Sequence, residues 1–286
     1  MTVDVFESNR SRLTGIAYGM LGSVMEAQDV VQDAYLRWAE VAHDEVDAPA
    51  AYLTTITTRL AIDRLRSAQK RREVYVGPWL PEPVVSSFAP DPAEAVIEAE
   101  SLSMAILTAL ERLNPVERAV LLLREIFDLD YSEIADIVDK SPSNCRQIAR
   151  RARDRAGDIR RTSARTDLDA QIIASYMDAV GRGDVEGLAK VFAQDIVLFS
   201  DGGGLARAAR HPLHGATRVA RHMIGVSPQA PEGTEVRLVR VNGDPSIMAV
   251  ANGRAIATVT FEIREGLITA IRAVLNPEKL GHLVDT

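Results

Sequence analysis

The stretch from residue 131 to 156, YSEIADIVDKSPSNCRQIARRARDRA, constrains the fold of this chain more than any other. Its first part repeats apolar residues at helical spacing, at Ile134, Ala135 and Val138. A short polar turn follows. Ser141 is then a good N-cap, and Pro142 suits the first position of a new helix, where its missing N–H is not needed. The stretch therefore predicts two helices joined by a tight turn.

The second of these helices has a narrow apolar stripe and a wide polar face that is rich in arginine. The stripe consists of Cys145, Ile148 and Ala152, and the residues predicted to point outward are Ser143, Asn144, Arg146, Gln147, Arg150 and Arg151. In a helix-turn-helix such side chains enter the major groove, where arginine reads guanine and asparagine or glutamine reads adenine. The alternative is an ordinary helical hairpin with a solvated basic face. The N-cap, the short turn and the outer face together favour DNA binding.

The charge distribution fits local DNA contacts better than general binding to polyanions. The chain carries a net charge of −7, yet two of its segments are strongly basic. Seven arginines lie between residues 146 and 161, and a second cluster holds Arg59, Arg64, Arg66, Lys70, Arg71 and Arg72. Two basic patches on an acidic protein predict two separate DNA contacts.

Composition argues against several other classes of protein. The single cysteine, Cys145, allows no internal disulfide and supplies no zinc cluster, and its place on the apolar stripe favours packing over redox sensing. The sequence has no run of eighteen apolar residues, and its N-terminus lacks the apolar region of a signal peptide. We therefore expect a cytoplasmic protein, and we expect no cofactor and no metal.

The chain divides into four segments. Residues 1–73 look helical throughout, and residues 93–165 are helical again and contain the helix-turn-helix. Between them, residues 74–92 hold five of the thirteen prolines and predict a linker without long helices. Trp79 and Leu80 are unusual in an exposed linker, so we expect this segment to dock onto another part of the protein. Docking with no regulatory meaning is equally compatible with the composition.

Residues 166–286 have a different character. Two amphipathic helices come first, and β-rich runs follow, separated by the turn dipeptides Asn242-Gly243, Asn252-Gly253 and Glu265-Gly266. Helices followed by a meander of antiparallel strands predict an α+β domain in which a curved sheet packs over helices.

In this order, the segments resemble a sigma-70 family factor of the extracytoplasmic-function (ECF) group, with regions 2 and 4. The stretches that carry the resemblance are EAQDVVQDAYLRWAE (26–40), PAAYLTTITTRLAIDRLRSAQKRR (49–72) and LNPVERAVLLLREIFDLDYSEIADIVDKSPSNCRQIARRARDRA (113–156). The last segment resembles the SnoaL-like, NTF2-like cone carried by a subgroup of these sigma factors, whose signature stretches are similar to WLPEP (79–83), DGGG (201–204) and NPEKL (276–280). The resemblance implies a multidomain fold of two all-α sigma domains, the second with the helix-turn-helix, plus a C-terminal α+β NTF2-like cone.

The resemblance also implies functions for the matching positions. The helix that docks onto the coiled coil of the polymerase beta-prime subunit would present Asp29, Gln32, Asp33 and Arg37. The helix that faces the −10 promoter element would hold unstacked bases and phosphates, with the candidates Tyr52, Thr55, Thr58, Arg59 and Arg64. The outward residues of the helix-turn-helix would meet the −35 element as duplex DNA.

In this subgroup the C-terminal domain is implied to act in cis on the two sigma domains and the linker. The residues implied in that contact are Trp79, Leu80, Pro81, Glu82 and Pro83, together with Asp201, Gly202, Gly203, Gly204, Asn276 and Pro277. Asp201 would accept hydrogen bonds from the linker or from an arginine, and the glycines allow a close backbone approach. The alternative is that DGGG is simply a flexible turn. Leu205 stands where the family usually has lysine, which puts a charge-dependent contact there in doubt.

The expected function is promoter-specific transcription initiation as a sigma subunit of RNA polymerase. The expected partners are the polymerase core, through its beta-prime and beta subunits, and promoter DNA. We expect no catalytic residue, no membrane contact, a monomer when free, and little promoter binding without core polymerase. An anti-sigma factor is compatible with this reading but not required.

The alternative is a transcription regulator whose cone binds a small ligand or retains enzymatic activity. Such activity would use acid–base chemistry by Asp201, His211, His214 or His222. Three histidines within twelve residues also suggest a metal site, but their spacing matches no ligand template.

Overall fold

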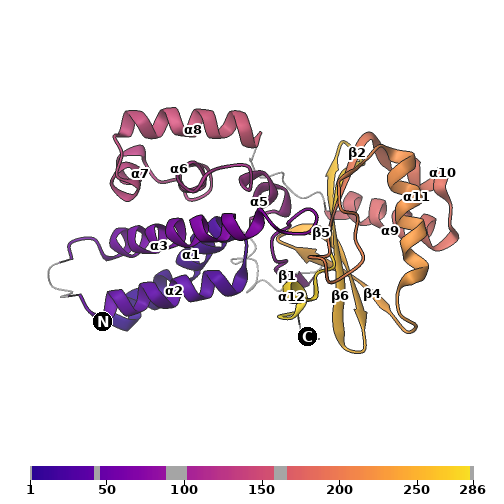
Figure 1. The fold of residues 1–286 in the computed structure, drawn as a ribbon, viewed down its shortest axis with the longest axis horizontal. Helices are drawn as coiled ribbons and strands as arrows, with labels where there is room; N and C mark the ends of the chain where they lie inside the picture. Colours follow the sequence, from indigo (N-terminus) through magenta and orange to yellow (C-terminus); the bar gives the residue numbers. More distant parts are fainter. Residues whose placement is uncertain (1, 42–45, 88–101, 158–165, 284–286) are drawn as a thin grey trace. The chain divides into compact units, whose positions relative to one another are not determined.

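The computed structural model describes residues 2–41, 46–87, 102–157 and 166–283 (Figure 1). The chain forms two compact units. Unit 1 consists of Met1–Val74 and Ala99–Arg161, and unit 2 consists of Tyr75–Glu98 and Thr162–Thr286. The segment boundaries expected at residues 92 and 165 lie outside the described residues.

Unit 1 is helical, as the sequence predicts. Its described helices are α1 (Thr2–Leu21), α2 (Val24–Ala39), α3 (Pro49–Arg72), α5 (Met104–Leu110), α6 (Pro115–Glu125), α7 (Tyr131–Val138) and α8 (Pro142–Ala156). Local capping sets several of the starts. The side chain of Ser23 accepts from the Glu26 N–H, and Asn114 and Glu117 form a reciprocal capping box with Pro115 at the first position of α6.

One continuous apolar core joins the early and late helices of unit 1. It contains Trp38 from α2, Leu65 from α3 and Leu122 from α6, all essentially buried. Helix α3 contacts α6 and α7 as well as α1 and α2. A fully buried arginine, Arg118, crosses this core and donates from Nε to the Gly19 carbonyl at 3.0 Å. Its charge is balanced by an ion pair with Glu111.

Unit 2 combines helices with a seven-stranded sheet. Its helices are α9 (Thr166–Arg182), α10 (Val185–Lys190), α11 (Ala216–Val226) and the short α12 (Pro277–Leu280). The strand order is β1-β4-β5-β6-β7-β2-β3, and the strands are β1 (Val85–Ser87), β2 (Phe192–Asp201), β3 (Leu213–His214), β4 (Glu235–Val241), β5 (Asp244–Ala251), β6 (Arg254–Arg264) and β7 (Leu267–Val274).

The predicted meander of unit 2 is confirmed. Antiparallel pairing joins β4 to β5, β5 to β6 and β6 to β7, and each connection is the predicted two-residue turn. Both residues of every turn have positive φ, including 55° at Asn242 and 52° at Glu265. Such turns match the twist of the strands they join. Helices pack over one face of the sheet, where Tyr176 of α9 meets Phe261 of β6 edge to face at 4.8 Å.

Several elements of unit 2 are not visible in the sequence pattern. The linker contributes β1, which pairs antiparallel with β4 at the edge of the sheet. Helix α11 buries Val219, Ala220 and Met223, and Phe192 begins β2 where the pattern extends a helix through it. Among the described helices, none is long and apolar enough to cross a membrane.

Two glycines of α1 test how tightly unit 1 is packed. A methyl group at Gly19 would lie 2.6 Å from Leu102 Cδ1 and 2.8 Å from Leu122 Cδ2, whereas one at Gly15 would meet only Phe127, at 3.4 Å. We expect Gly19→Ala to lower the free energy of unfolding by about 1–3 kcal/mol through overpacking. Gly15→Ala, the matched control, should be neutral or stabilising by up to about 1 kcal/mol because alanine favours the helix. Urea denaturation followed by far-UV circular dichroism measures both, and equal effects would contradict this packing.

Candidate functional site

The helix-turn-helix forms as predicted and is rigidly built. Asp139, with a φ of 54°, ends α7, and Ser141 caps α8 by accepting from the Asn144 N–H at 3.2 Å. The apolar stripe of α8 is buried in the core of unit 1, with Cys145 completely inaccessible. Burial raises the pKa of the Cys145 thiol, which fits a packing residue better than a reactive one.

The arginines of α8 fall into two groups. Arg153 pairs with Glu125 at 2.6 Å and Arg155 with Glu117 at 2.8 Å, so these two tie α8 to α6. All four side chains are exposed, but Arg150 and Arg151 form no ion pair with any residue that the structure describes. Arg146 lies over the ring of Tyr131, with 5.4 Å between the guanidinium carbon and the ring centroid. The outward face thus keeps unneutralised positive charge.

The structure exposes most of the predicted DNA-reading face of α8. Ser143, Arg146, Gln147, Arg150 and Arg151 are exposed, and Asn144 is half-buried beside the cap. They stand on a helix whose other side is fixed in the core. Such a helix can enter a groove without rearrangement of its own residues.

The predicted polymerase-docking residues share the solvent face of α2. Asp29, Gln32, Asp33 and Arg37 are all exposed, while the opposite face buries Ala27, Val30, Val31, Ala34 and Trp38. The carboxylate of Asp29 forms an exposed ion pair with Arg64 of α3, at 2.7 Å. Exposed pairs of this kind contribute little stability and exchange readily for another partner.

The candidates for −10 binding on α3 differ in their exposure and in their contacts within unit 1. Tyr52 is half-buried against Trp38, with ring centroids 5.9 Å apart, and Thr55 bonds to the Ala51 carbonyl at 2.8 Å. Arg59 donates to two backbone carbonyls at the end of α7, those of Ile137 at 2.9 Å and Asp136 at 2.7 Å. The basic face of α3 is therefore partly engaged within unit 1.

Thr58 does not lie on the exposed face predicted for it. It is completely buried, because it falls on the same stripe of α3 as Thr54, Ala61 and Leu65. In this arrangement its hydroxyl is not available to DNA.

In unit 2, Asp201 at the end of β2 is the centre of a buried polar cluster. Its side chain is completely inaccessible and accepts from the Tyr75 hydroxyl at 2.6 Å, the Leu80 N–H at 2.7 Å and the Gly203 N–H at 3.1 Å. Lys279 of α12 completes the cluster with an ion pair at 2.7 Å. Of the two donors expected as alternatives for Asp201, the linker is present, and the cation beside it is Lys279 and not an arginine.

Lys279 links the same cluster to the linker. Its ammonium group lies 4.0 Å from the ring centroid of Trp79 and donates to the Leu80 carbonyl. Asn276 donates to the Tyr75 hydroxyl at 2.9 Å. Burial, and then the hydrogen bond to Asp201, raises the pKa of Tyr75, so this phenol stays protonated and keeps donating.

The remaining linker contacts run along the sheet edge. The Val84 N–H donates to Asn242 Oδ1 at 3.1 Å, and the Asn242 N–H donates to the Val84 carbonyl at 2.8 Å. Pro81 and Pro83 are buried, Glu82 is half-buried, and Pro277 opens α12 behind its cap Asn276. His282 lies within hydrogen-bonding distance of the Pro83 carbonyl, at 2.8 Å.

The glycines after Asp201 are required by this close approach. Gly203 has a φ of 59°, and a methyl group on it would collide with the amide of Asn276 and lie 2.9 Å from the Tyr75 hydroxyl. Gly202 is enclosed by Ala206 and Ala208 in the same way. The DGGG segment is therefore a packed turn against the linker and α12, not a flexible one.

Sequence reasoning missed two residues of the Asp201 cluster, Tyr75 and Lys279, and two residues that contact the linker, Asn242 and His282. Lys279 belongs to the NPEKL stretch, which the sequence analysis had singled out. Its contact with Asp201, however, follows only from the fold. The three histidines do not join the cluster as ligands. His211 and His214 are exposed, and burial followed by the charge of Arg207 lowers the pKa of His222. Across the described residues, no group of three or more His, Cys, Asp or Glu side chains is arranged to hold a metal.

Comparison with known proteins assigns this combination of surfaces. The family model for Sigma-70 region 2 matches residues 5–71, and that for Sigma-70, region 4 matches residues 103–155. The chain is 34% identical to the ECF RNA polymerase sigma factor SigJ of Mycobacterium tuberculosis, over 98% of this chain and 93% of that protein. The chain belongs to the ECF RNA polymerase sigma factors. It directs promoter-specific transcription initiation, as its regions 2 and 4 imply.

A second relative and a solved structure also match this ECF sigma factor over nearly its full length. The probable ECF RNA polymerase sigma factor SigI of the same species is 29% identical, over 97% of this chain and 94% of that protein. The crystal structure of SigJ matches with a TM-score of 0.78 at 29% identity and covers 98% of both chains. The expected fold class is confirmed in its outline, helical sigma domains followed by an α+β domain with a curved sheet over helices.

The buried pair in unit 2 gives a direct test of linker docking. Asp201→Asn leaves Lys279 charged and buried, so we expect it to lower the free energy of unfolding of unit 2 by about 3 kcal/mol or more. The double variant Asp201→Asn with Lys279→Met removes both charges and should recover much of this loss. Asp195→Asn, on the exposed face of the same strand, is the control and should be within about 0.5 kcal/mol of the wild type.

Denaturation followed by tryptophan fluorescence, with limited proteolysis of residues 75–84, measures these effects. If Asp201→Asn were as stable as the control Asp195→Asn, the ion pair of Asp201 with Lys279 would not be what holds the linker.

Proposed function

We propose that this ECF sigma factor reads the −35 element with the outward face of α8. The observation that supports this most directly is the division of the α8 arginines, in which Arg153 and Arg155 are neutralised inside unit 1 while Arg150 and Arg151 are not. Uncompensated guanidinium groups on a rigid helix face suit both guanine edges and phosphates. Ser143, Asn144, Arg146 and Gln147 complete the reading face.

We propose further that the exposed face of α2 docks onto the beta-prime subunit of core polymerase, with contacts to the beta subunit elsewhere. Asp29, Gln32, Asp33 and Arg37 provide a mixed-charge surface, and the weak Asp29–Arg64 pair leaves both partners available. Arg64 would then move to the DNA backbone at the −10 element, where Tyr52, Thr55 and Arg59 supply ring, hydroxyl and cation.

The contact between α3 and α7 suggests that the free protein is in a resting state. Arg59 cannot hold the carbonyls of Asp136 and Ile137 and a promoter phosphate at the same time, and Thr58 is sealed in the core. We propose that polymerase binding separates α3 from α7 and releases Arg59. Differential binding of polymerase to the open form would supply the driving force. This accounts for the expectation of little promoter binding by the free factor.

Unit 2 is proposed to regulate the two sigma regions in cis. The chain between the end of α3 at Arg72 and the start of α5 at Met104 passes through unit 2, where Tyr75, Leu80 and β1 are anchored. Anchoring shortens the free chain between the two regions. The separation that they can reach therefore depends on whether the linker is docked.

No enzymatic role is proposed for unit 2. Asp201, the strongest acid–base candidate, is buried and occupied by four donors, which leaves no lone pair directed at a substrate. We propose that the factor acts in the cytoplasm with core polymerase and promoter DNA, is a monomer when free, and does not require an anti-sigma factor.

The −35 assignment predicts the effect of a single arginine. Arg150→Ala should lower transcription from a −35-dependent promoter by about tenfold, because one base or phosphate contact is lost. Arg182→Ala, which removes an equal charge from unit 2, should leave transcription unchanged. In vitro transcription with purified core polymerase measures activity, and co-purification with the core measures polymerase binding. Loss of polymerase binding by Arg150→Ala would contradict the assignment.

The cis-regulation proposal predicts the effect of displacing the linker. Gly203→Ala should change transcription by about fivefold or more, because its methyl group collides with Asn276 and crowds Tyr75. Gly233→Ala is the matched control, since Gly233 also has a positive φ, of 77°, but has no atom within 4 Å of the added methyl group. Both variants place alanine at a positive φ, and only Gly203→Ala adds a collision, so equal transcription from the two would reject control through the linker.

A further inference from the structure

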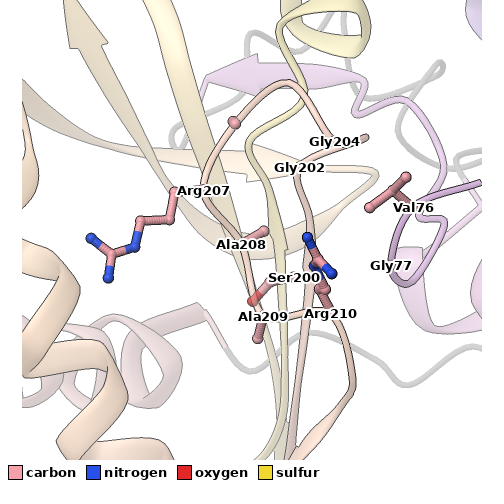
Figure 2. A pocket seen from close by; sticks show the side chains of 10 residues that line it. Val76, Gly77, Ser200, Gly202, Gly204, Arg207, Ala208, Ala209 and Arg210 are labelled. Atoms are coloured by element: carbon pink, nitrogen blue, oxygen red, sulfur yellow. The ribbon is translucent and has the colours of Figure 1, made fainter.

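Unit 2 contains a cavity of about 210 Å³ beside the docked linker (Figure 2). Its walls are formed by Val76 and Gly77 of the linker, by Ser200 near the end of β2, and by the loop from residue 202 to residue 210. The linker and the cone thus both contribute walls to a single cavity.

The charged groups in the cavity wall are all cationic. Arg207 and Arg210 line it, and no carboxylate does. Figure 2 shows the Arg207 side chain extending away from the cavity, and its Nη1 donates to Gln229 Oε1 at 3.0 Å. The guanidinium of Arg210 lies between the DGGG loop and the linker residues Val76 and Gly77 in the same view. Within the parts of the chain that the structure describes, Arg210 has no ion pair and no side-chain hydrogen bond.

A serine hydroxyl lies in the wall as well. Ser200 is only 4% exposed, and none of the described residues forms a hydrogen bond with its side chain. The hydroxyl itself keeps some accessible surface, so it can donate a hydrogen bond to a ligand in the cavity. The backbone N–H groups of Ala208, Ala209 and Arg210 also make no hydrogen bond to the described part of the chain.

From these groups we infer that the cavity binds a small oxyanion and that a phosphate group is the ligand it fits best. Arg210 supplies a charge-assisted fork of donors, and Ser200 supplies a hydroxyl. These donors come from different walls. A tetrahedral phosphate presents oxygens in several directions, whereas a carboxylate presents two in one plane, and the volume leaves space for a small organic substituent.

The position of the cavity couples ligand binding to linker docking. A ligand that contacts both the loop and Val76 binds only while the linker is docked, so it stabilises the docked form by mass action. The existence of the binding site does not depend on the proposed regulation. Its effect on transcription does, because it rests on that proposal. The docked linker would then report the level of a phosphorylated small molecule or of phosphate itself.

Isothermal titration of the full chain with inorganic phosphate, at constant ionic strength, tests the site. We expect saturable binding, and we expect Arg210→Ala to weaken it by about tenfold or more, the loss typical of one charge-assisted hydrogen bond. Ser200→Ala should weaken it by a smaller factor. Arg218→Ala, which removes an exposed arginine of α11 outside the cavity wall, is the control and should bind as the wild type does.

Three results would overturn the inference. These are the absence of saturable phosphate binding, an equal loss in Arg210→Ala and Arg218→Ala, and acetate binding as tightly as phosphate, which would reject the phosphate assignment. In vitro transcription with and without phosphate then separates the site from its consequence. Binding that depends on Arg210, with no change in transcription by the wild type, would retain the site and reject its coupling to the proposed regulation.

Discussion

The buried carboxylate of Asp201 is the interaction on which the C-terminal half of this sigma factor depends. An isolated charge of this kind is too costly to remove from water, so it must be surrounded by donors. Lys279 supplies the opposite charge, and the linker supplies the Tyr75 hydroxyl and the Leu80 N–H. The linker is therefore part of the solvation shell of a buried ion. Undocking it removes two donors at once, which makes its attachment cooperative.

The same reasoning separates the arginines of unit 1. Arg118, Arg153 and Arg155 are paired with glutamates and hold the late helices together, and Arg150 and Arg151 remain exposed at the surface of α8. The proposed recognition helix has both kinds. Arg153 and Arg155 hold α8 against α6, and in the proposed function the unpaired arginines keep the charge that attracts DNA. Arg59 of α3 is an intermediate case. It has partners, but they are uncharged backbone carbonyls that a phosphate can replace.

The linker connects the promoter-reading function with the proposed control by the cone. It enters the sheet as edge strand β1, covers Asp201 and closes one wall of the oxyanion cavity. A single segment of chain thus takes part in the sheet, in a buried ion cluster and in a ligand site. In the proposed regulation, a change in any of these contacts would alter how firmly the linker is docked.

The sequence by itself determined the elements whose signals are local. The caps at Ser141 and Asn114, the helical periodicity of residues 131–156 and the three turns of the meander specify backbone geometry within a few residues, and all of them form. Only the tertiary structure decided that Thr58 is buried, that Arg153 and Arg155 are paired, that the linker supplies a strand, and that Tyr75 and Lys279 meet Asp201. These outcomes depend on residues far apart in the chain, 126 positions for Tyr75 and Asp201 and 156 for Val85 and Val241 in the pairing of β1 with β4, and no local pattern encodes such a contact.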